Sequence, residues 1–280
     1  MRYTVADCYK YGRAKLDGCK LNPADANFLL PLALKTDKNN LPLDMPVSKK
    51  KYNKYCKLIR LRCKHMSMDK IIGFTEFMNV TIPFSHNVLT PRQETEILVD
   101  MIIKDNKSRK NIKVLDLCTG SGCIGISIAK ELCAEVTLSD ISKSALKEAS
   151  RNARLNNVKV ACVHSDLFDN ISNTFDIIVS NPPYIPTCDV QTLEPEVLGF
   201  DPVLALDGGE DGLDFYRRIA IEAPKYLNPN GKLYLEIGID EGEKIKDIFS
   251  PYFQNISVIK DYGGIDRFVI AEKRENNNVK

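Results

Sequence analysis

The stretch Val114-Leu-Asp-Leu-Cys-Thr-Gly-Ser-Gly122 has the pattern of a short buried strand that runs into a loop of small residues. The next residues, 123–132, are apolar at helical spacing, so the loop is expected to open a helix. Gly120 and Gly122 carry no Cβ and let the backbone approach a ligand closely. The amino end of the helix offers free N–H groups to an anionic group. This order predicts a ligand-binding turn, and a tight turn without a ligand is the alternative.

Strands and helices alternate on both sides of this turn. Their spacing predicts a mostly parallel, doubly wound, Rossmann-like sheet of the α/β class with right-handed crossovers. Ligands bind to such sheets beyond the carboxyl ends of the strands, where the strand order reverses. From the apolar runs we expect strands at 114–117, 136–138, 158–163, 175–179, 233–237, 256–259 and 268–271, and helices at 93–104, 123–132, 143–156, 213–226 and 243–249.

The segment before this α/β region has a different character. Its first part shows helical periodicity broken by turns, with helices expected at 24–34 and 48–63, and its last part has the apolar and turn residues of a β-hairpin. We therefore divide the chain into a small helical domain, a β-hairpin linker, a large α/β domain and a disordered tail, at residues 1–70, 71–90, 91–274 and 275–280.

The overall charge gives no general case for direct nucleic-acid binding. The 280 residues hold 39 Lys and Arg against 37 Asp and Glu, a net charge of +2, whereas nucleic-acid-binding domains are usually strongly basic. One basic run, 48–70, is the exception. It has two interpretations: a solvated helix face, or a docking face for an acidic partner or RNA.

The cysteines and the hydropathy indicate a cytoplasmic protein. Nine cysteines are scattered along the chain without a C-x-x-C pair, which argues against structural zinc and favours a reducing compartment. The first 15 residues lack the apolar core of a signal peptide, and no apolar run approaches the length of a membrane span. We therefore expect neither a metal nor a membrane among the partners.

Asp116 helps to choose the ligand of the small-residue loop. A dinucleotide would bring an anionic pyrophosphate close to this loop, and a nearby carboxylate would repel it. S-adenosylmethionine brings a sulfonium and an ammonium group, which a carboxylate attracts. Asp116 therefore favours the methyl donor over a dinucleotide cofactor.

Two further strands end in acidic residues that suit the rest of this donor. Asp140 ends the second strand and can accept hydrogen bonds from ribose hydroxyls. The alternative is an N-cap of the next helix, a role for which Ser142 competes. After the third strand, Asp166 can bond an adenine amino group. Phe168 can cover the adenine ring or be a core aromatic residue.

The most specific motif is Asn181-Pro-Pro-Tyr184, directly after the fourth strand. Two prolines remove two backbone donors and leave carbonyls that only accept. A planar amide or exocyclic amine offers two N–H groups, of which the Asn181 side-chain oxygen can accept one and the Pro182 carbonyl the other. Tyr184 can stack on the flat group. Such an arrangement would hold a nitrogen in line with a methyl group, so that positioning supplies much of the catalysis. A rigid turn is the alternative.

These residues belong to a wider pattern. The chain resembles the HemK/PrmC-type glutamine methyltransferases, which methylate the Gly-Gly-Gln loop of peptide chain release factors. The matching segments are Gly73-Phe-Thr-Glu-Phe77, Thr90-Pro-Arg-Gln-Glu-Thr-Glu96, Glu194-Pro-Glu196, Ala205-Leu-Asp-Gly-Gly-Glu-Asp-Gly-Leu-Asp-Phe-Tyr216, Glu236-Ile-Gly238 and residues 261–267.

The resemblance implies a class I methyltransferase fold, with S-adenosylmethionine as donor and S-adenosylhomocysteine as product. The small helical domain would dock on the release factor, and the enzyme would work in the cytoplasm. We also expect the protein to be a monomer that makes no direct contacts with nucleic acid. The substrate glutamine would be held by Asn181, Pro182, Pro183 and Tyr184, with Asn181, Pro182 and Tyr184 catalytic. The donor would be bound by Cys118, Thr119, Gly120, Ser121, Gly122, Asp140, Phe168 and Asn181, to which the arguments from charge and strand ends add Asp116 and Asp166.

Two rival functions and one departure accompany this interpretation. The Asn-Pro-Pro-Tyr box is shared with enzymes that methylate adenine or guanine amino groups of DNA or RNA. A non-catalytic docking scaffold is the second rival, against which the intact box argues. Cys118 stands where the family has the first glycine of its loop. Either Cys118 has a negative φ, or the loop is reshaped.

Overall fold

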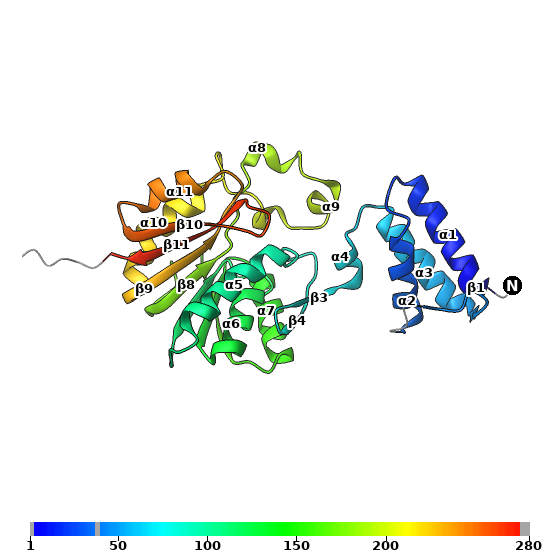
Figure 1. Ribbon diagram of the computed structural model, residues 1–280, viewed down its shortest axis with the longest axis horizontal. Helices are drawn as coiled ribbons and strands as arrows, with labels where there is room; N and C mark the ends of the chain where they lie inside the picture. The colour runs from blue at the N-terminus through cyan, green and yellow to red at the C-terminus, as the bar shows by residue number, and fades with distance from the viewer. Residues whose placement is uncertain (1–2, 37–39, 275–280) are drawn as a thin grey trace, which may run out of the picture. The chain divides into compact units, whose positions relative to one another are not determined.

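The computed structural model describes residues 3–36 and 40–274, which form two compact units. The smaller unit comprises the chain up to Gly73 together with Glu194–Phe200, and the larger comprises Phe74–Leu193 and the chain from Asp201 (Figure 1). The tail that we expected to be disordered, 275–280, lies outside the described residues. In the two described ranges, no helix combines the length and the apolar character needed to cross a membrane.

The smaller unit is a set of helices packed around its own apolar core. Thr4 and Ser48 cap two of the helices through hydrogen bonds to backbone N–H groups, which explains where those helices begin. A two-residue pairing, β1 with β2, ties the start of the chain to the segment before the third helix. The elements are β1 (Tyr3–Thr4), α1 (Val5–Gly18), α2 (Asp25–Leu34), β2 (Pro46–Val47), α3 (Lys49–Arg62) and α4 (Met68–Ile72).

The basic run divides into an exposed and a buried part. The lysines at the start of α3, Lys49, Lys50 and Lys51, are exposed to solvent. Arg62 at its end is buried, and its guanidinium pairs with Asp25 and Glu196 at 2.7 Å each. Arg62 is therefore a structural residue of this unit, whereas the exposed basic residues of the run are available to a partner.

The larger unit is built on one seven-stranded sheet in the order β10-β11-β9-β8-β5-β6-β7. The pairs from β9 to β7 are parallel, and β11 is antiparallel to both of its neighbours. The expected mostly parallel sheet is therefore confirmed. Its strands are β5 (Lys113–Leu117), β6 (Glu135–Asp140), β7 (Val160–His164), β8 (Phe175–Ser180), β9 (Leu227–Glu236), β10 (Phe253–Lys260) and β11 (Asp266–Lys273).

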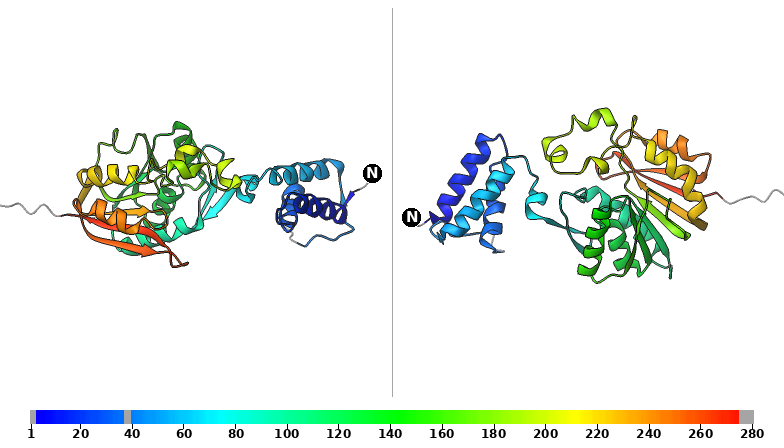
Figure 2. Two further views of the ribbon diagram at one scale, coloured as in Figure 1. Left: turned by 90° about the horizontal axis from the view of Figure 1, so that it is seen from above. Right: turned by 180° about the vertical axis from the view of Figure 1, so that it is seen from behind.

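Helices cover both faces of this sheet, as Figures 1 and 2 show. Side chains along β5 alternate between two cores: Val114 packs with the helices of one face, and Leu115 and Leu117 pack with those of the other. The first face carries α5 (Gln93–Asn106), α6 (Cys123–Leu132) and α7 (Lys143–Leu155), and the second carries α10 (Asp214–Tyr226) and α11 (Gly242–Phe249). Between β8 and α10 lie the short helices α8 (Thr187–Val190), α9 (Pro195–Leu198) and η1 (Val203–Ala205).

The hairpin of β3 (Phe74–Phe77) and β4 (Val80–Pro83) packs on the larger unit. Phe77 belongs to the same apolar core as α6 and α7. Asn152 of α7 and Asn156, directly after the end of α7, extend the contact, because they donate to the carbonyls of Pro83 and Thr81 respectively. The hairpin is therefore anchored to the α/β domain by buried surface and by hydrogen bonds.

Candidate active site

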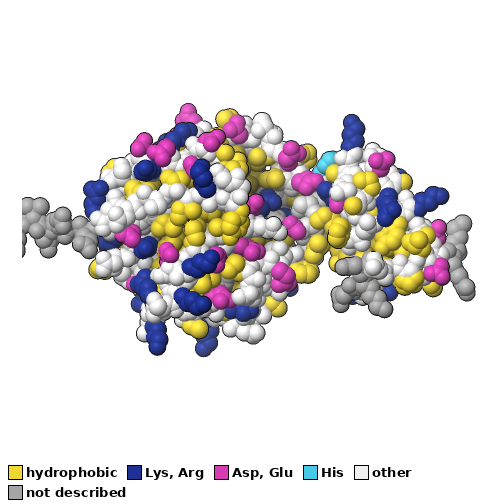
Figure 3. Space-filling model, in the orientation of Figure 1, with side chains coloured by type: hydrophobic (Ala, Val, Ile, Leu, Met, Phe, Trp, Pro, Cys, Tyr) yellow, Lys and Arg dark blue, Asp and Glu magenta, His cyan; other side chains and the backbone are white. Residues whose placement is uncertain are grey.

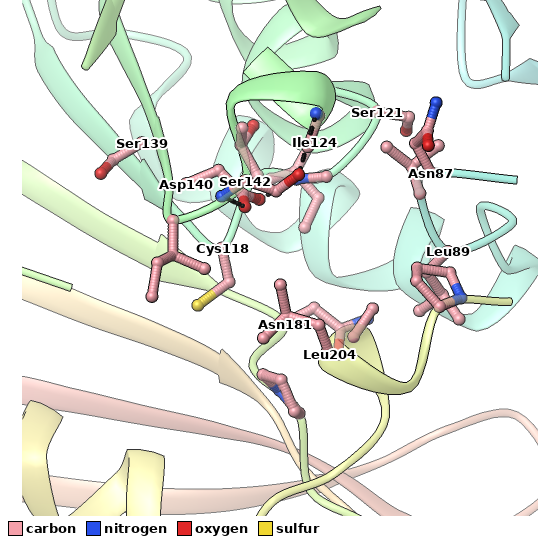
Figure 4. A pocket seen from close by; sticks show the side chains of 18 of the residues that line it. Asn87, Leu89, Cys118, Ser121, Ile124, Ser139, Asp140, Ser142, Asn181 and Leu204 are labelled. Carbon is pink, nitrogen blue, oxygen red and sulfur yellow. Dashed lines mark hydrogen bonds between the residues drawn. The ribbon is translucent and has the colours of Figure 1, made fainter. Parts of the chain in front are cut away.

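A cavity of about 340 Å³ lies at the carboxyl ends of the parallel strands. Its walls include the loops that follow β5, β6, β7 and β8, which is the edge of the sheet where ligands of such folds bind. Figure 4 shows side chains of these loops around one space, with Asp140 and Cys118 on one side, Asn181 below them and Leu89 opposite. The size is typical of small-molecule sites.

The loop after β5 contributes Cys118, Thr119, Gly120 and Ser121 to the cavity wall. Gly120 has a φ of +53°, and a Cβ added there would meet nothing within 4 Å, so its missing side chain leaves open space beside the cavity. Gly122 is not among the lining residues. Its φ is +84°, and a Cβ would lie 2.8 Å from Ile126 and 3.0 Å from Ala149. Gly120 thus suits close approach by a ligand, whereas Gly122 is required for helix packing.

Cys118 adopts a φ of +55°, in the left-handed region that glycine occupies most easily. The alternative of a negative φ is therefore wrong, and Cys118 lies in a backbone region that a glycine would adopt without strain. The cost is local strain of about 1 kcal/mol for a residue with a Cβ.

Asp116 does not line the cavity, which corrects the charge argument made from the sequence. It is fully buried, and Oδ2 accepts hydrogen bonds from Thr119 Oγ1 at 2.6 Å and from the Gly125 N–H at 2.9 Å. Burial raises the pKa of Asp116 to about 7. The side chain points into the face of the sheet that α6 covers, so Asp116 organises the loop from behind.

Asp140 lies on the cavity wall and joins two of the loops. Oδ2 accepts from the Gly120 N–H at 2.9 Å, and Oδ1 accepts from the Ser142 N–H at 2.8 Å. Ser142 supplies the N-cap of α7, so Asp140 is not that cap. Burial raises the pKa of Asp140, and the two backbone hydrogen bonds oppose the shift. Each carboxylate oxygen retains a lone pair for a ligand hydroxyl.

The residues after β7 are divided between the cavity and the core. Asp166 lines the cavity and pairs with Arg218, another lining residue, at 2.9 Å. Phe168 is fully buried and stacks on Tyr226 with ring centroids 4.8 Å apart. The expectation that Phe168 covers a ligand ring is therefore wrong for this structure, because the pairing with α10 holds the ring inside the core. Leu167 lines the cavity instead.

The Asn181-Pro-Pro-Tyr184 segment leaves β8 at the floor of the cavity. Asn181 and Pro183 are lining residues, whereas Pro182 and Tyr184 lie outside the lining. Burial raises the pKa of Tyr184 to about 12, so its hydroxyl stays protonated. Asn181 is thus placed beside the loops after β5 and β6, as Figure 4 shows.

Several residues to which the sequence assigned no ligand contact shape this cavity, although Thr90 and Arg92 lie in one of the matching segments. Thr90 and Arg92 line it, and both donate to the buried carboxylate of Asp201. Ser139, at the end of β6, lines the cavity and has a buried hydroxyl without a hydrogen-bond partner among the described residues. Ser139 could have been found from the sequence, because it directly precedes Asp140 at the end of the same strand. Asp201 could not, since only its tertiary contacts connect it with the cavity.

Glu236 is the least expected of these residues, since its side chain ends a central strand in a buried position. It is 2% exposed, and Thr95 Oγ1 donates to Oε2 at 2.6 Å. Burial raises the pKa of Glu236 to about 7, while hydrogen bonds from Thr95 and Asn181 and the charge of Arg267 oppose the shift. A buried carboxyl of this kind beside a cavity is typical of functional sites.

The cavity fits S-adenosylmethionine by its chemistry. The open space at Gly120 admits close backbone approach, and the orphaned Ser139 hydroxyl offers a hydrogen bond to a ligand. Asp140 presents carboxylate oxygens to hydroxyl groups on the same wall. The carboxylate of Asp140 also suits a ligand that carries positive charge, whereas Asp166 already pairs with Arg218.

The strand order, the antiparallel β11 and the cavity at the strand ends define a class I methyltransferase. A methyltransferase structure from Pyrococcus furiosus has the same fold, with a TM-score of 0.54 and 21% identity over 70% of this chain and 90% of that one. Residues 76–193 match the family model of the methyltransferase small domain.

Two relatives narrow the class to one family. The release factor glutamine methyltransferase of Thermodesulfovibrio yellowstonii is 38% identical over 263 residues, which are 91% of this chain and 94% of the relative. The enzyme of the same name from Agrobacterium fabrum is 42% identical over 231 residues, 79% of this chain and 80% of the relative. The chain belongs to the release factor glutamine methyltransferase family, which confirms the resemblance seen in its motifs.

Proposed function

We propose that the protein transfers a methyl group from S-adenosylmethionine to the side-chain amide nitrogen of the glutamine in the Gly-Gly-Gln loop of a peptide chain release factor. This methylation would support translation termination. The observation that carries the proposal is the position of Asn181, which lines the same cavity as Gly120 and Asp140. A nitrogen held by Asn181 would therefore lie next to a donor held by these two loops.

The donor supplies a methyl group on a positively charged sulfur, which is already strongly electrophilic. The chain has to hold the donor and present the acceptor. Gly120, Ser139 and Asp140 are the residues that would hold it, through backbone approach and hydrogen bonds. Tethering both reactants in one cavity turns a bimolecular reaction into a unimolecular one.

The acceptor nitrogen needs help because its lone pair is delocalised into the amide carbonyl. Asn181 Oδ1 would accept one N–H of the glutamine amide, and the Pro182 carbonyl would accept the other. Both bonds draw the hydrogens toward oxygen and favour a localised lone pair on nitrogen. As the methyl group joins nitrogen and leaves sulfur, the nitrogen gives up one proton to water. No basic side chain is needed before this transfer.

A nucleobase amino group is the second candidate acceptor. It too offers two N–H groups on a flat framework, so the same acceptor pair fits it. The exposed lysines at the start of α3 are the feature that favours it, because they offer positive charge to phosphates. On the face seen in Figure 3, however, the described Lys and Arg side chains of the larger unit are interspersed with Asp and Glu.

Peptide mass spectrometry tests the two candidates. A purified release factor is incubated with the full chain and S-adenosylmethionine, and the same factor with its loop glutamine replaced by Asn is the control. We expect a gain of one methyl group on the glutamine peptide and none in the control. If the donor binds in calorimetry but the factor stays unmodified, the proposal fails and a methylated base in RNA or DNA becomes the next measurement.

The proposal extends to the setting of the enzyme. All nine cysteines are free thiols, which supports action in the reducing cytoplasm. We also propose that the enzyme acts as a monomer with a release factor as its macromolecular partner. Sedimentation velocity at working concentration tests whether the enzyme is a monomer. Copurification with a tagged release factor tests whether the two proteins bind each other.

A further inference from the structure

Asn181 and Glu236 are brought together by the pairing of two neighbouring strands. β8 and β9 are parallel, and Ser180 at the end of β8 pairs with Leu235 on β9. The next residues in register are Asn181 and Glu236, so both side chains stand at the same edge of the sheet. The Asn181 side chain lowers the pKa of Glu236, as a nearby amide N–H does for a carboxylate. The residue that faces the cavity therefore lies next to a buried carboxyl behind it.

The carboxyl of Glu236 is itself held in place. Thr95 on α5 donates to Oε2 at 2.6 Å, and Thr95 also lines the cavity. The backbone of Glu236 is fixed from the opposite face of the sheet, where the Tyr216 hydroxyl donates to its carbonyl at 3.0 Å. With 2% of its surface exposed, Glu236 has little freedom to adopt another rotamer.

This contact decides which end of the Asn181 amide faces the cavity. An amide side chain has an oxygen that accepts and a nitrogen that donates, and the two ends have nearly the same shape. An ionised carboxylate only accepts, so it must receive the nitrogen. The oxygen then points away from Glu236, toward the acceptor nitrogen that needs it.

We propose that Glu236, held by Thr95, is a positioning residue that fixes the amide orientation of Asn181 and so presents Oδ1 to the substrate nitrogen. The inference rests on the proposed function, since it assigns the part that these residues play in the same transfer. When Glu236 is protonated, its O–H becomes a donor and pairs with Asn181 Oδ1. That pairing removes the acceptor from the cavity, so ionised Glu236 is the active form.

The ionisation of Glu236 is set by groups on every element packed against it. Burial and the charge of Glu94 raise its pKa, and Thr95, Asn181 and Arg267 lower it. The other titratable groups that interact with it are Cys123 on α6, Tyr184 after β8 and Tyr216 on α10. The three are neutral near pH 7, because burial raises the pKa of each above its ordinary value.

The first test compares single-turnover rates of methylation as a function of pH. In the wild-type chain we expect the rate to rise as pH increases through about 7, because Glu236 ionises there. The substrate amide does not titrate in this range, so it adds no dependence of its own. Glu236→Gln keeps an acceptor oxygen but removes the proton, so we expect a flat profile at a rate between the wild-type extremes.

Glu241→Gln is the matched control for loss of a buried carboxyl. Glu241 is 8% exposed and burial raises its pKa to about 7, but it accepts from the Gly238 N–H, and Asn181 is not among the groups that lower its pKa. We expect this variant to keep the wild-type pH profile. A Glu236→Gln profile that superimposes on that of the wild type would overturn the assignment.

The second test uses Thr95, whose hydroxyl can be removed without changing the shape of the side chain. We expect Thr95→Val to lower kcat on the order of ten-fold, since a misdirected Glu236 leaves Asn181 free to turn. Thr95→Ser should restore most of the rate, and the donor Kd should change less than about three-fold in both. Equal rates in the Val and Ser variants would contradict the proposal. Absence of methylation by the wild-type chain would instead contradict the proposed function.

Discussion

The two halves of the candidate active site are organised in different ways. On the donor side, carboxylates tie backbone to backbone: Asp140 accepts from the N–H groups of Gly120 and Ser142, and Asp116 accepts from Gly125. On the acceptor side, Asn181 depends on another side chain, Glu236, which depends in turn on Thr95. A backbone amide has one donor in a fixed direction, whereas a side-chain amide can turn over. The backbone fold therefore fixes the donor side, whereas the acceptor side depends on the ionisation of Glu236 and on the rotamer of Asn181.

The largest effect is expected from removal of the acceptor oxygen. Asn181→Ala should lower kcat by about 100-fold or more, because the amide nitrogen loses a hydrogen bond that aligns it with the methyl group. The donor Kd should change much less, since the loops after β5 and β6 remain intact. Rapid-quench methylation and calorimetry measure the two quantities. A variant as active as the wild type would exclude the assigned role.

The counterpart on the donor side is Asp140→Ala. It removes two backbone hydrogen bonds and the carboxylate that would meet the ligand hydroxyls. We expect S-adenosylmethionine to bind about ten- to 100-fold more weakly, in line with the loss of one or two hydrogen bonds to a charged group. Calorimetric titration measures this, and Asp211→Ala, an exposed carboxylate remote from the lining, is the control. An unchanged Kd would mean that Asp140 only joins the loops.

The two glycines of the loop after β5 sharpen the comparison within the donor side. Gly122→Ala should lower the free energy of unfolding by about 2 kcal/mol or more, because the left-handed φ and the contact with Ile126 and Ala149 both penalise a Cβ. Gly120→Ala should cost only about 1 kcal/mol, for φ alone, since its Cβ meets open space. Urea unfolding compares them.

Donor binding should be weakened more by Gly120→Ala than by Gly122→Ala, which is the reverse of the order expected for stability. The added methyl group of Gly120→Ala would protrude from the wall and narrow the cavity. The Kd of this variant for S-adenosylmethionine should therefore increase although the fold is little disturbed. Equal unfolding free energies for the two variants would contradict the distinction between approach and packing.

The last effect, which requires no change of sequence, is a dependence of stability on pH. Burial raises the pKa of Asp116, Glu236 and Glu241 to about 7, so the folded state holds these protons more tightly than the unfolded state. Their contribution to stability is complete below the ordinary pKa near 4 and is lost as pH rises through about 7. The free energy of unfolding should fall as pH rises from about 4 to about 7 and level off above that range, by at most about 1.4 kcal/mol per pH unit for each group.

Two variants connect this stability effect with the two halves of the site. Asp116→Asn and Glu236→Gln should each flatten the decline of stability with pH, as urea unfolding at a series of pH values would measure. Only Glu236→Gln should also change the pH dependence of methylation. A stability that stays constant or rises across the neutral range would contradict the raised pKa values.

Much of the fold was predictable because its signals are local. The apolar runs at β5, β6 and β8 and the helical spacing of α6 and α7 place the parallel strands and crossovers close to where the structure has them. The site residues that end strands, Asp140 and Asn181, were also predictable, since the carboxyl ends of parallel strands share one edge. The roles of Thr95, Asp201 and Glu236 were not, because each acts through a partner far away in the chain, although Thr95 and Glu236 lie in segments quoted for the family resemblance.

The sequence by itself determined the order of strands and helices along the chain, the small-residue loop at 118–122 and the family to which the chain belongs, since all three depend on residue types at fixed spacing. Only the tertiary structure decided where the side chains point. It turned Asp116 beneath α6 and Phe168 against Tyr226, and it placed Glu236 beside Asn181. The reason is that side-chain direction follows from strand register and from the helix packed on each face, which are long-range contacts that no local pattern records.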